Sequence, residues 1–463
     1  MKINKDAIRN IYFVGAGGIG MAALERYFLS RGKNVAGYDL TPSELTASLE
    51  KEGVTMTYDS SADTIPAQFR DPATTLVVYT PAVPADLPIL TYFRDNGFDV
   101  IKRAELLGLV TRGSRSLCFA GTHGKTTTSS MAAHIMQCGS TGCNAFLGGI
   151  LKNYDSNFIL TPSSSYSVIE ADEFDRSFHH LTPTVAVITA TDPDHLDIYG
   201  TEEAYLESFA HFTELIQPGG SLVVHTGLKL KPRPGCDVKV YTYSRDEGDF
   251  HASYIRRTPG NITFDIVTPL GTIRNINLGV PVEVNIENAV AAVAAVTLAG
   301  CFDAETIRKA LNTYGGIKRR FETWLREPGE KGRVIIDDYA HHPQEIEASI
   351  ASVRSLYPGR HLTVAFQPHL YTRTRDFAAE FGEALSKADD VILVDLYPAR
   401  ELPIEGISTE TIARHIKNTP VTMIPKENLA KSLENRNFDI LLTMGAGDMV
   451  NELPAVVEAV SAR

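Results

Sequence analysis

The sequence predicts an α/β protein of three domains. Alternating short apolar runs and helical patterns begin afresh at three places along the 463 residues. Such alternation is typical of parallel sheets with helices on their faces. A chain of this length also exceeds what one hydrophobic core usually holds. We expect the domains to span residues 1–111, 112–316 and 317–463.

The first domain is expected to be Rossmann-like. The apolar run "IYFV" at 11–14 ends at Gly15, and an alanine-rich helical pattern follows from Ile19 to Ser30. This order predicts a strand, a turn and a helix. The expected further elements are strands at 34–39, 75–80 and 99–104, and a helix at 43–52.

The central domain is expected to be a P-loop ATPase-like α/β domain, and the third another Rossmann-like one. A strand at 116–119 leads into a glycine loop, and a helix runs from Thr126 to about Cys138. The other central elements are predicted as strands at 166–172, 184–190 and 220–226, antiparallel hairpins between 241 and 280, and an apolar helix at 285–299. The third domain is predicted to hold strands at 333–340, 361–366, 390–396 and 439–449, helices from Pro343 and Arg375, and a closing helix.

Composition excludes several classes of protein. The formal net charge of -12 argues against sequence-independent binding to nucleic acid, which needs clustered Lys and Arg. The five cysteines show no C-x-x-C pair and are expected to be reduced thiols. No stretch approaches about 18 apolar residues, and the N-terminus lacks a secretory signal. We expect a cytoplasmic protein with no nucleic-acid or membrane partner.

A glycine-rich loop follows the first predicted strand. Its glycines stand directly between a strand and a helix, where backbone N–H groups can face an anion. This context favours a phosphate-binding loop over a purely structural turn. Asp39, which ends the next strand, would suit a ribose hydroxyl in a dinucleotide fold, and composition alone does not separate NAD from another pyrophosphate. The loop glycines are Gly15, Gly17, Gly18 and Gly20.

The second loop, "GTHGKTTT", is a stronger signal. Gly121 and Gly124 allow a tight turn whose amides cradle phosphate, although two residues separate them where the usual loop has four. Lys125 can reach the outer phosphates, and the Thr126 hydroxyl can bind magnesium. ATP or a close relative is the expected ligand.

Acidic residues and a histidine follow two strands of the central domain. Glu170 ends one predicted strand, and His195 lies just past another. In an open α/β sheet the carboxyl ends of strands gather at the ligand crevice, so both side chains are expected near Thr126. Oxygen ligands suit magnesium, whereas imidazole is a less usual partner for it. The neighbouring Asp172, Glu173 and Asp175 are expected to be solvated loop charges.

Two polar clusters follow strands of the third domain. Histidines there are candidate bases near neutral pH, and arginines could hold carboxylate or phosphate. Each alone is more readily explained as a surface or helix-terminus residue. The clusters contain His341, His342, His369, Arg319, Arg320, Arg373 and Arg375.

Taken together, these motifs resemble the Mur ligases of peptidoglycan precursor synthesis, most closely the members that add L-alanine. The resemblance runs from end to end. It rests on "GAGGIGM", "YTPAVP", "KRAELLG", "AGTHGKTTT", "EADEFDRSF", "DPDHLDIYG", "RRFE", "DDYAHHP" and "FQPHLYTRTRDF", all in the expected order.

The resemblance implies an ATP-dependent ligase. ATP would phosphorylate the lactyl carboxylate of UDP-N-acetylmuramate with the help of Mg²⁺, and the amine of L-alanine would displace phosphate from the acyl phosphate. A monomer or weak homodimer is expected. The resemblance implies that the sugar nucleotide is bound by Gly15, Gly17, Gly18, Ile19, Gly20, Asp39, Thr80 and Arg103.

The residues implied to bind ATP and to act in catalysis lie in the second and third expected domains. ATP would be bound by Gly121, Thr122, His123, Gly124, Lys125, Thr126, Thr127, Asn285, Asn288, Arg320 and Asp338. The implied metal ligands are Thr126, Glu170 and His195. The implied catalytic residues are Lys125, His195, His342, His369 and Arg373, of which the last two also bind L-alanine. Either His369 or His342 is hypothesised to remove the proton of the amine.

Two residues depart from the family pattern, and the absence of lysine from one segment helps to distinguish between members of the family. Val284 stands where members commonly have a histidine near adenine, and Leu370 stands where related members often have arginine. No lysine occurs between Lys152 and Lys229, which fits ligases without a carbamylated lysine. That leaves the alanine-adding enzyme and, as the alternative, the ligase that recycles a whole tripeptide.

Two functions from other classes are also compatible with single motifs. An NAD-dependent oxidoreductase would use the first loop but leaves "GTHGKTTT" unexplained. A nucleotide-switch binding protein would use the second loop and would hydrolyse ATP slowly without an acceptor.

Overall fold

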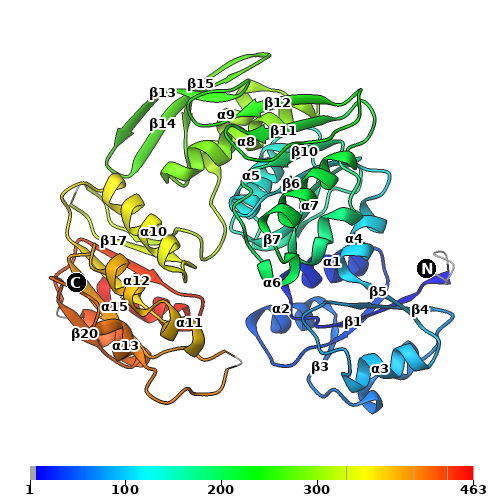
Figure 1. The fold of residues 1–463 in the computed structure, drawn as a ribbon, viewed down its shortest axis with the longest axis horizontal. Helices are drawn as coiled ribbons and strands as arrows, with labels where there is room; N and C mark the ends of the chain where they lie inside the picture. The colour runs from blue at the N-terminus through cyan, green and yellow to red at the C-terminus, as the bar shows by residue number, and fades with distance from the viewer. Residues whose placement is uncertain (1–6, 330, 400, 435, 462–463) are drawn as a thin grey trace. The chain divides into compact units, whose positions relative to one another are not determined.

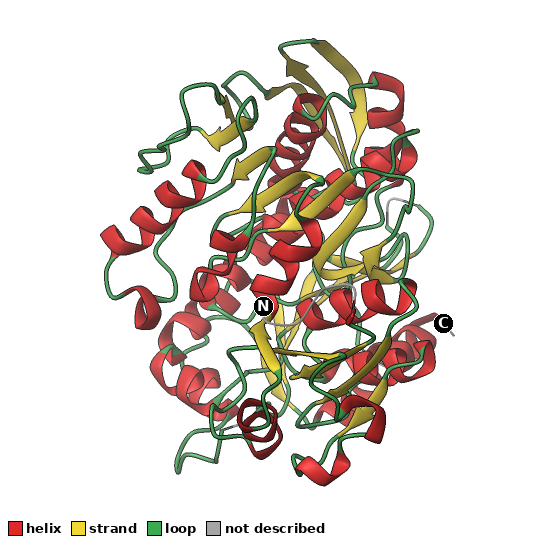
Figure 2. Cartoon of the chain, turned by 90° about the vertical axis from the view of Figure 1, so that its right-hand side faces the viewer, coloured by secondary structure: helices red, strands yellow, loops and turns green. Residues whose placement is uncertain are grey.

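The computed structural model describes residues 7–329, 331–399, 401–434 and 436–461. These residues fold into two compact units. The first contains residues up to 254 together with 264–276 and 284–315, and the second contains 255–263, 277–283 and the residues from 316 onward. Helices flank parallel sheets along the chain, which confirms the predicted α/β class (Figures 1 and 2).

The N-terminal sheet has five parallel strands in the order β3-β2-β1-β4-β5. The predicted strand, turn and helix at its start are confirmed. The strands are β1 (Asn10–Val14), β2 (Asn34–Tyr38), β3 (Thr55–Thr57), β4 (Thr75–Tyr79) and β5 (Asp99–Lys102). The helices are α1 (Ile19–Ser30), α2 (Glu44–Glu52), η2 (Ala62–Thr64), η3 (Ala67–Phe69), α3 (Pro88–Asp95) and α4 (Arg103–Thr111).

The central sheet has seven strands in the order β12-β11-β10-β6-β9-β7-β8. Only β8 runs antiparallel to its neighbour. The strands are β6 (Arg115–Ala120), β7 (Asn144–Leu151), β8 (Ser156–Ile159), β9 (Tyr166–Glu170), β10 (Val185–Ile188), β11 (Ser221–His225) and β12 (Lys239–Tyr243). The helices are α5 (Lys125–Cys138), η4 (Phe174–His180), α6 (Leu196–Tyr199) and α7 (Glu202–Glu214).

Three strands form a separate sheet in the order β13-β14-β15. They are β13 (His251–Thr258), β14 (Asn261–Thr268) and β15 (Gly271–Asn277), and two-residue connections require them to run antiparallel. The predicted hairpins are therefore confirmed for this region. The hairpin prediction is wrong at 241–243, because β12 extends the central parallel sheet instead. Two helices, α8 (Glu283–Leu298) and α9 (Ala304–Thr313), follow.

The C-terminal sheet has six strands in the order β16-β17-β21-β18-β19-β20, and only β16 is antiparallel. The strands are β16 (Glu322–Arg326), β17 (Val334–Asp338), β18 (Leu362–Phe366), β19 (Asp390–Leu393), β20 (Val421–Met423) and β21 (Ile440–Met444). The helices are α10 (Pro343–Leu356), α11 (Tyr371–Asp376), α12 (Ala378–Leu385), α13 (Thr409–Ala413), η5 (Lys426–Asn428), α14 (Leu429–Leu433), η6 (Met449–Glu452) and α15 (Leu453–Ser461).

The helix predicted from Arg375 begins earlier and is interrupted. Helix α11 starts at Tyr371, and Phe377 separates it from α12 with φ -119° and ψ 22°, outside the helical region. Leu370, just before α11, has a φ of +69°, which is unusual for a residue with a side chain. The backbone therefore turns sharply after His369 before the helix begins.

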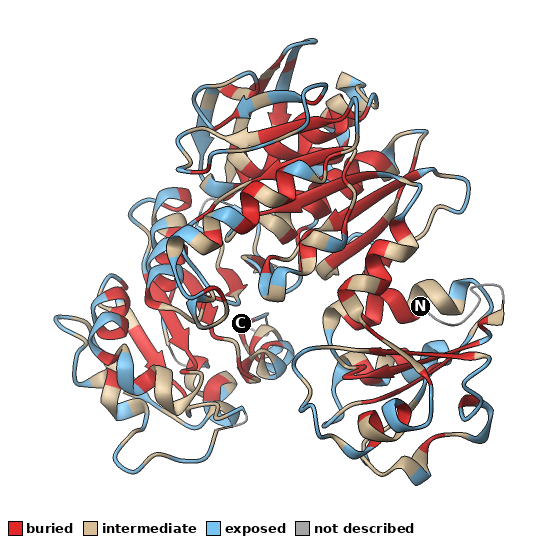
Figure 3. Cartoon of the chain, turned by 45° about the vertical axis from the view of Figure 1, so that its right-hand side comes forward, coloured by how far each residue is buried: buried red, intermediate tan, exposed pale blue. Residues whose placement is uncertain are grey.

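Buried residues lie along the sheet strands and on the helix faces that cover them (Figure 3), and they form several hydrophobic clusters. All five residues of β1, β18 and β21 are buried, as expected for strands of a sheet covered on both faces. Helix α8 is apolar nearly all round and is buried over most of its length. Among the described residues, no helix combines the length and apolar character that crossing a bilayer requires. The limits of the three predicted domains stay a prediction.

Candidate active site

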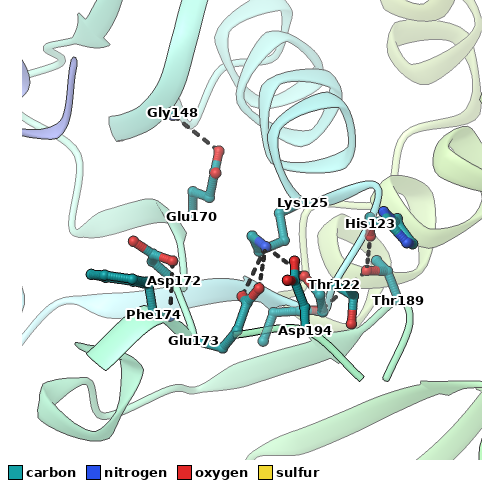
Figure 4. Close-up of polar contacts among 12 residues, drawn as sticks. Thr122, His123, Lys125, Gly148, Glu170, Asp172, Glu173, Phe174, Thr189 and Asp194 are labelled. Atoms are coloured by element: carbon teal, nitrogen blue, oxygen red, sulfur yellow. Dashed lines mark hydrogen bonds and ion pairs between the residues drawn. The ribbon is translucent and has the colours of Figure 1, made fainter. Parts of the chain in front are cut away.

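The second glycine loop connects β6 to α5 and needs its glycines. Gly121 and Gly124 have φ values of +140° and +82°. A Cβ on Gly121 would lie 2.2 Å from the Thr189 hydroxyl oxygen, so no side chain fits there. The Thr122 N–H donates to the Ala190 carbonyl at 3.1 Å, and the Thr189 hydroxyl donates to the His123 carbonyl (Figure 4). The loop is thus anchored to the segment that follows β10.

The loop lies beside Glu170 because of strand order and register. Strand β6 lies between β10 and β9, and all three run parallel. Ala120 pairs with Ile188 on one side, and Phe119 pairs with Glu170 on the other. Since parallel strands end at the same edge of a sheet, the segments after them meet there. The parallel register thus brings these strand ends to one edge, and the placement of the Glu170 and His195 side chains near Thr126 stays a prediction.

Lys125, the first residue of α5, is paired with a carboxylate that sequence reasoning placed in solvent. Its Nζ lies 2.9 Å from Oε1 and 2.8 Å from Oε2 of Glu173, and it donates to the Gly121 carbonyl at 2.6 Å (Figure 4). Glu173 is buried, with a side chain 2% exposed. Burial raises the pKa of Glu173, while the Lys125 charge and hydrogen bond oppose that rise. The expectation of a solvated loop charge is wrong for Glu173.

Helix α8 brings two asparagines to the nucleotide-loop helix. The Thr128 hydroxyl donates to Asn288 Oδ1 at 3.2 Å, and Asn288 Nδ2 donates to Asn285 Oδ1 at 3.0 Å. Both asparagines are buried, as is Thr126, whereas Val284 is 56% exposed. The two predicted asparagines therefore lie in the same unit as the loop, next to its helix.

Glu170 is held against the backbone of β7. Its Oε2 accepts from the Gly148 N–H at 3.0 Å (Figure 4), and a Cβ on Gly148 would lie 2.4 Å from either carboxylate oxygen. His195 has a left-handed backbone with φ 52°, and its Nε2 lies 3.6 Å from Asp194 Oδ2. The Phe174 ring lies edge to face with the His195 ring at 5.1 Å. Among the described residues, no group of three or more His, Cys, Asp or Glu is arranged to hold a metal ion.

A cavity of about 230 Å³ lies between the first glycine loop and Glu170. Six predicted residues from four separate motifs line it: Gly18, Ile19, Gly20, Thr80, Arg103 and Glu170. Sequence reasoning missed several others, above all Phe146, Leu147 and Gly148 of β7 and Asp172 and Phe174 after β9. The glycine pair after the apolar run "AFL" is the signal that could have identified β7 as a wall of the site. His195 is not among the described residues that line this cavity.

The remaining residues of the first loop support its backbone. A Cβ on Gly15 would lie 2.4 Å from Thr80 Cγ2, so the Thr80 side chain packs directly on this glycine. Asp39 Oδ2 accepts from the Gly17 N–H at 2.6 Å. Asp39 therefore holds the loop through its backbone, which differs from the ribose contact considered for a dinucleotide fold.

In the second unit, predicted residues gather after β17 and β18. The rings of His341 and His369 lie 6.0 Å apart, and the His369 ring stacks on Tyr397 at 5.7 Å. Burial lowers the pKa of His341. Arg373, on α11, has a buried Nη1 with no hydrogen-bond partner. The ring of His342 lies 5.0 Å from Phe377.

Arg320 and Asp338 also lie near each other in this unit. Asp338 Oδ1 accepts from the Phe321 N–H at 3.2 Å, and the Ser349 hydroxyl donates to Oδ2. Burial raises the pKa of Asp338, and the charge of Arg320 opposes that rise. Arg320 itself is exposed.

Arg319 and Arg375 have other roles. Arg319 donates to the carbonyls of Gly447 at 3.0 Å and Gly445 at 2.6 Å, which ties it to the backbone after β21. Arg375 pairs with Asp376 at 2.7 Å on the surface. The surface interpretation therefore fits Arg375.

The fold and the site together define an α/β protein with a glycine loop of the nucleotide-binding type and a neighbouring cavity. Family models agree with this class over nearly the whole chain. The Mur ligase family catalytic domain matches residues 10–115, the Mur ligase middle domain matches 119–296, and the Mur ligase glutamate ligase domain matches 319–447. The chain belongs to the Mur ligase family.

The alignments with individual relatives include almost all of this chain and almost all of the relative. The UDP-N-acetylmuramate–L-alanine ligase of Phocaeicola vulgatus is 55% identical, over 97% of this chain and 98% of its own. The enzyme of the same name from Porphyromonas gingivalis is 50% identical, over 96% and 97%. The crystal structure of the UDP-N-acetylmuramate-alanine ligase MurC of Thermotoga maritima matches with a TM-score of 0.82 and 26% identity, covering 98% and 99%.

Proposed function

We propose that this protein joins L-alanine to the lactyl carboxylate of UDP-N-acetylmuramate at the expense of ATP, with ADP and phosphate as the other products. One observation of the structure carries the proposal. The segment Glu170–Phe174 contributes Glu173 to the nucleotide loop and Glu170, Asp172 and Phe174 to the adjoining cavity. A nucleotide and a second ligand bound at these places would share one wall. The names of the relatives at 50–55% identity support the choice of substrates.

The first step would transfer the γ-phosphoryl group to the carboxylate. A free carboxylate resists attack by an amine, whereas an acyl phosphate carries a good leaving group. Lys125 and the loop amides would stabilise charge on the transferred group, which is mainly a task of electrostatics and positioning. Arg103 lines the cavity, and its side chain is 17% exposed. Its guanidinium would hold an anionic part of the sugar nucleotide.

Magnesium fits the donors that this site offers. Mg²⁺ is usually bound by one or two protein oxygen ligands together with substrate phosphates and water. The Thr126 hydroxyl at the start of α5 and the Glu170 carboxylate are donors of this kind. When bound, the ion would neutralise charge on the phosphates. His195 would complete the set only as a less usual ligand.

The second step would be attack of the L-alanine amine on the acyl phosphate. An α-amino group has a pKa near 8, so it needs to lose a proton at neutral pH. His369 or His342 would accept that proton. The Arg373 guanidinium, with its unpartnered Nη1, suits the carboxylate of L-alanine. The roles of Asn285, Asn288, Arg320 and Asp338 in binding the nucleotide likewise belong to this proposal.

One assay tests the function. Phosphate release from ATP is measured with UDP-N-acetylmuramate and with L-alanine, L-serine, glycine or the tripeptide as acceptor. We expect release that requires the sugar nucleotide and is fastest with L-alanine. Release that ignores the sugar nucleotide would refute the proposal, and a preference for the tripeptide would instead identify the recycling ligase.

The setting of the enzyme is proposed from the sequence. We propose a cytoplasmic protein, present as a monomer or weak homodimer, without nucleic-acid or membrane partners. Light scattering during gel filtration checks the oligomeric state directly.

A further inference from the structure

The carboxylate of Glu173 is the feature of the site that the proposed reaction does not yet use. Its two oxygens lie 2.8 and 2.9 Å from Lys125 Nζ, and the side chain is 2% exposed against 14% for Lys125. A buried charge of this kind persists only when it is paired, because desolvation otherwise favours the neutral form. Glu173 and Lys125 thus form one unit within the nucleotide loop.

The backbone around Glu173 is held in an unusual conformation. Asp175 and Arg176, neither of them glycine, have φ values of +50° and +54°. The Tyr199 hydroxyl and the Arg176 N–H both donate to the Glu173 carbonyl, at 2.5 and 2.9 Å. The Arg176 guanidinium lies over the Tyr199 ring at 4.8 Å. Residues with side chains in the left-handed region are costly and cluster at functional sites. These two stand just after Glu173, whose carboxylate contacts Lys125.

The position of Lys125 depends on this contact. An ammonium on a four-carbon stem is flexible, and it becomes preorganised only when its donors are engaged. Lys125 uses one donor on the Gly121 carbonyl and directs another to Glu173. These two acceptors fix Nζ close to the loop, where the outer phosphates of a nucleotide bind.

We propose that Glu173 is a positioning residue for Lys125, and that it sets the rate of phosphoryl transfer without contributing to the affinity for ATP. This inference rests on the proposed function. Its carboxylate aims the ammonium at the transferred group, where a misplacement of about 1 Å can cost a factor of about 100 in rate. The same negative charge repels the triphosphate in the ground state, so it does not favour binding. Replacing a residue that only stabilises the fold would not lower the rate while leaving the affinity for ATP intact.

The variants Glu173→Gln and Glu173→Asp test the proposal. Two quantities are measured for each with Mg²⁺ present: the dissociation constant of ATP by equilibrium dialysis, and the single-turnover rate of ADP formation with UDP-N-acetylmuramate, since ADP is released from ATP when the acyl phosphate forms. We expect Glu173→Gln to bind ATP at least as tightly as the wild type, with a rate about 10- to 100-fold lower. Glu173→Asp, which keeps the charge, is expected to recover part of that rate.

Asp175→Asn is the matched control. It removes a negative charge from the same segment, tolerates the left-handed backbone, and pairs outside the loop with Lys102 at 2.7 Å. Its rate and affinity should stay within twofold of the wild type. Thermal unfolding of each variant is recorded to show that it is folded. If Glu173→Gln does not fold, the rate and the ATP affinity of Glu173→Asp are compared with those of the wild type instead.

Two results would overturn the inference. One is a wild-type rate in Glu173→Gln, and the other is weaker ATP binding that accounts for the lost rate. If the wild type forms no ADP with the sugar nucleotide, the proposed ligase activity fails instead. The ATP affinities then decide on Glu173 alone: binding at least as tight in Glu173→Gln supports the inference, and weaker binding refutes it.

Discussion

At the scale of single residues, burial decides which charges the chain can carry. His134, on α5, is 5% exposed and contacts the Tyr154 hydroxyl at 2.9 Å and the Thr313 hydroxyl at 3.1 Å. Burial lowers the pKa of His134 to about 4. Neutral imidazole makes both contacts, one as donor and one as acceptor. The helix that carries the nucleotide loop is therefore sensitive to acid through this side chain.

His134 predicts a loss of stability in mild acid. Its pKa in the unfolded chain is near 6.5, so the unfolded chain binds the proton first as pH falls. The stabilisation is present above pH 6.5 and is lost toward pH 4, with a total of about 3 kcal/mol. The free energy of unfolding is measured with urea at pH 7.5 and at pH 5.0. Its decrease between these two pH values should be smaller for His134→Gln than for the wild type.

His225 supplies the control for that experiment. Its hydrogen bond and ion pair with Glu287 raise the pKa of His225, so its contribution is lost as pH rises. In His225→Gln the free energy of unfolding should therefore decrease more between pH 7.5 and pH 5.0 than it does in the wild type. Equal pH dependence in His134→Gln and the wild type would contradict the prediction.

Arg373 predicts a selective loss of affinity for the amino acid. Arg373→Lys keeps the charge but removes the planar fork that binds a carboxylate through two hydrogen bonds. We expect the KM for L-alanine to rise about 10- to 100-fold, with the KM for UDP-N-acetylmuramate nearly unchanged. Steady-state kinetics measure both. Arg375→Lys, two residues away and paired with Asp376 on the surface, should leave both constants unchanged.

At the scale of elements, close backbone contacts shape the cavity. Strand β7 contributes Phe146, Leu147 and Gly148 to the wall, and the Glu170 carboxylate lies directly on Gly148. Strand β7 was not predicted because its two glycines weaken the strand pattern. Glycine is used here because a carboxylate from β9 occupies the space that a side chain would fill.

Gly148→Ala should disturb the site without unfolding the sheet. The added methyl group would lie 2.4 Å from the Glu170 oxygens and displace them. We expect kcat/KM for UDP-N-acetylmuramate to fall at least about tenfold, because misplacing a group that helps hold the reactants is costly in rate. Gly235→Ala is the control, because a Cβ there meets no atom closer than 3.5 Å. A Gly148→Ala enzyme with wild-type kinetics would argue against a role for Glu170.

At the scale of the whole molecule, the sequence was enough to predict the fold class but not the walls of the site. The glycine loops and apolar runs are local signals, so the strands around them were predicted well. Glu173 was misjudged because its burial depends on Tyr199 and Lys125, which are distant in sequence. Arg319 could not be interpreted for the same reason, since its partners follow β21.

Ligand binding should stabilise the whole chain in a metal-dependent manner. ATP at about 100 times its Kd adds about 2.7 kcal/mol to the stability of the unit that binds it. We expect ATP with Mg²⁺ to raise the unfolding temperature, and EDTA to reverse most of that rise, because the phosphates then lose their counter-charge. Differential scanning fluorimetry measures both. AMP, which lacks the outer phosphates, should give a much smaller shift, and an equal one would contradict the role of Lys125.

The shared wall between the nucleotide loop and the cavity has a consequence for inhibition. A single compound that fills the cavity and extends along Glu170–Phe174 would reach the ammonium of Lys125 without leaving the protein surface. Tethering two weak fragments in this way turns the second contact into an intramolecular one, with an effective concentration in the millimolar range for a short linker. Inhibitor design against this enzyme can therefore begin from two fragments that each bind weakly.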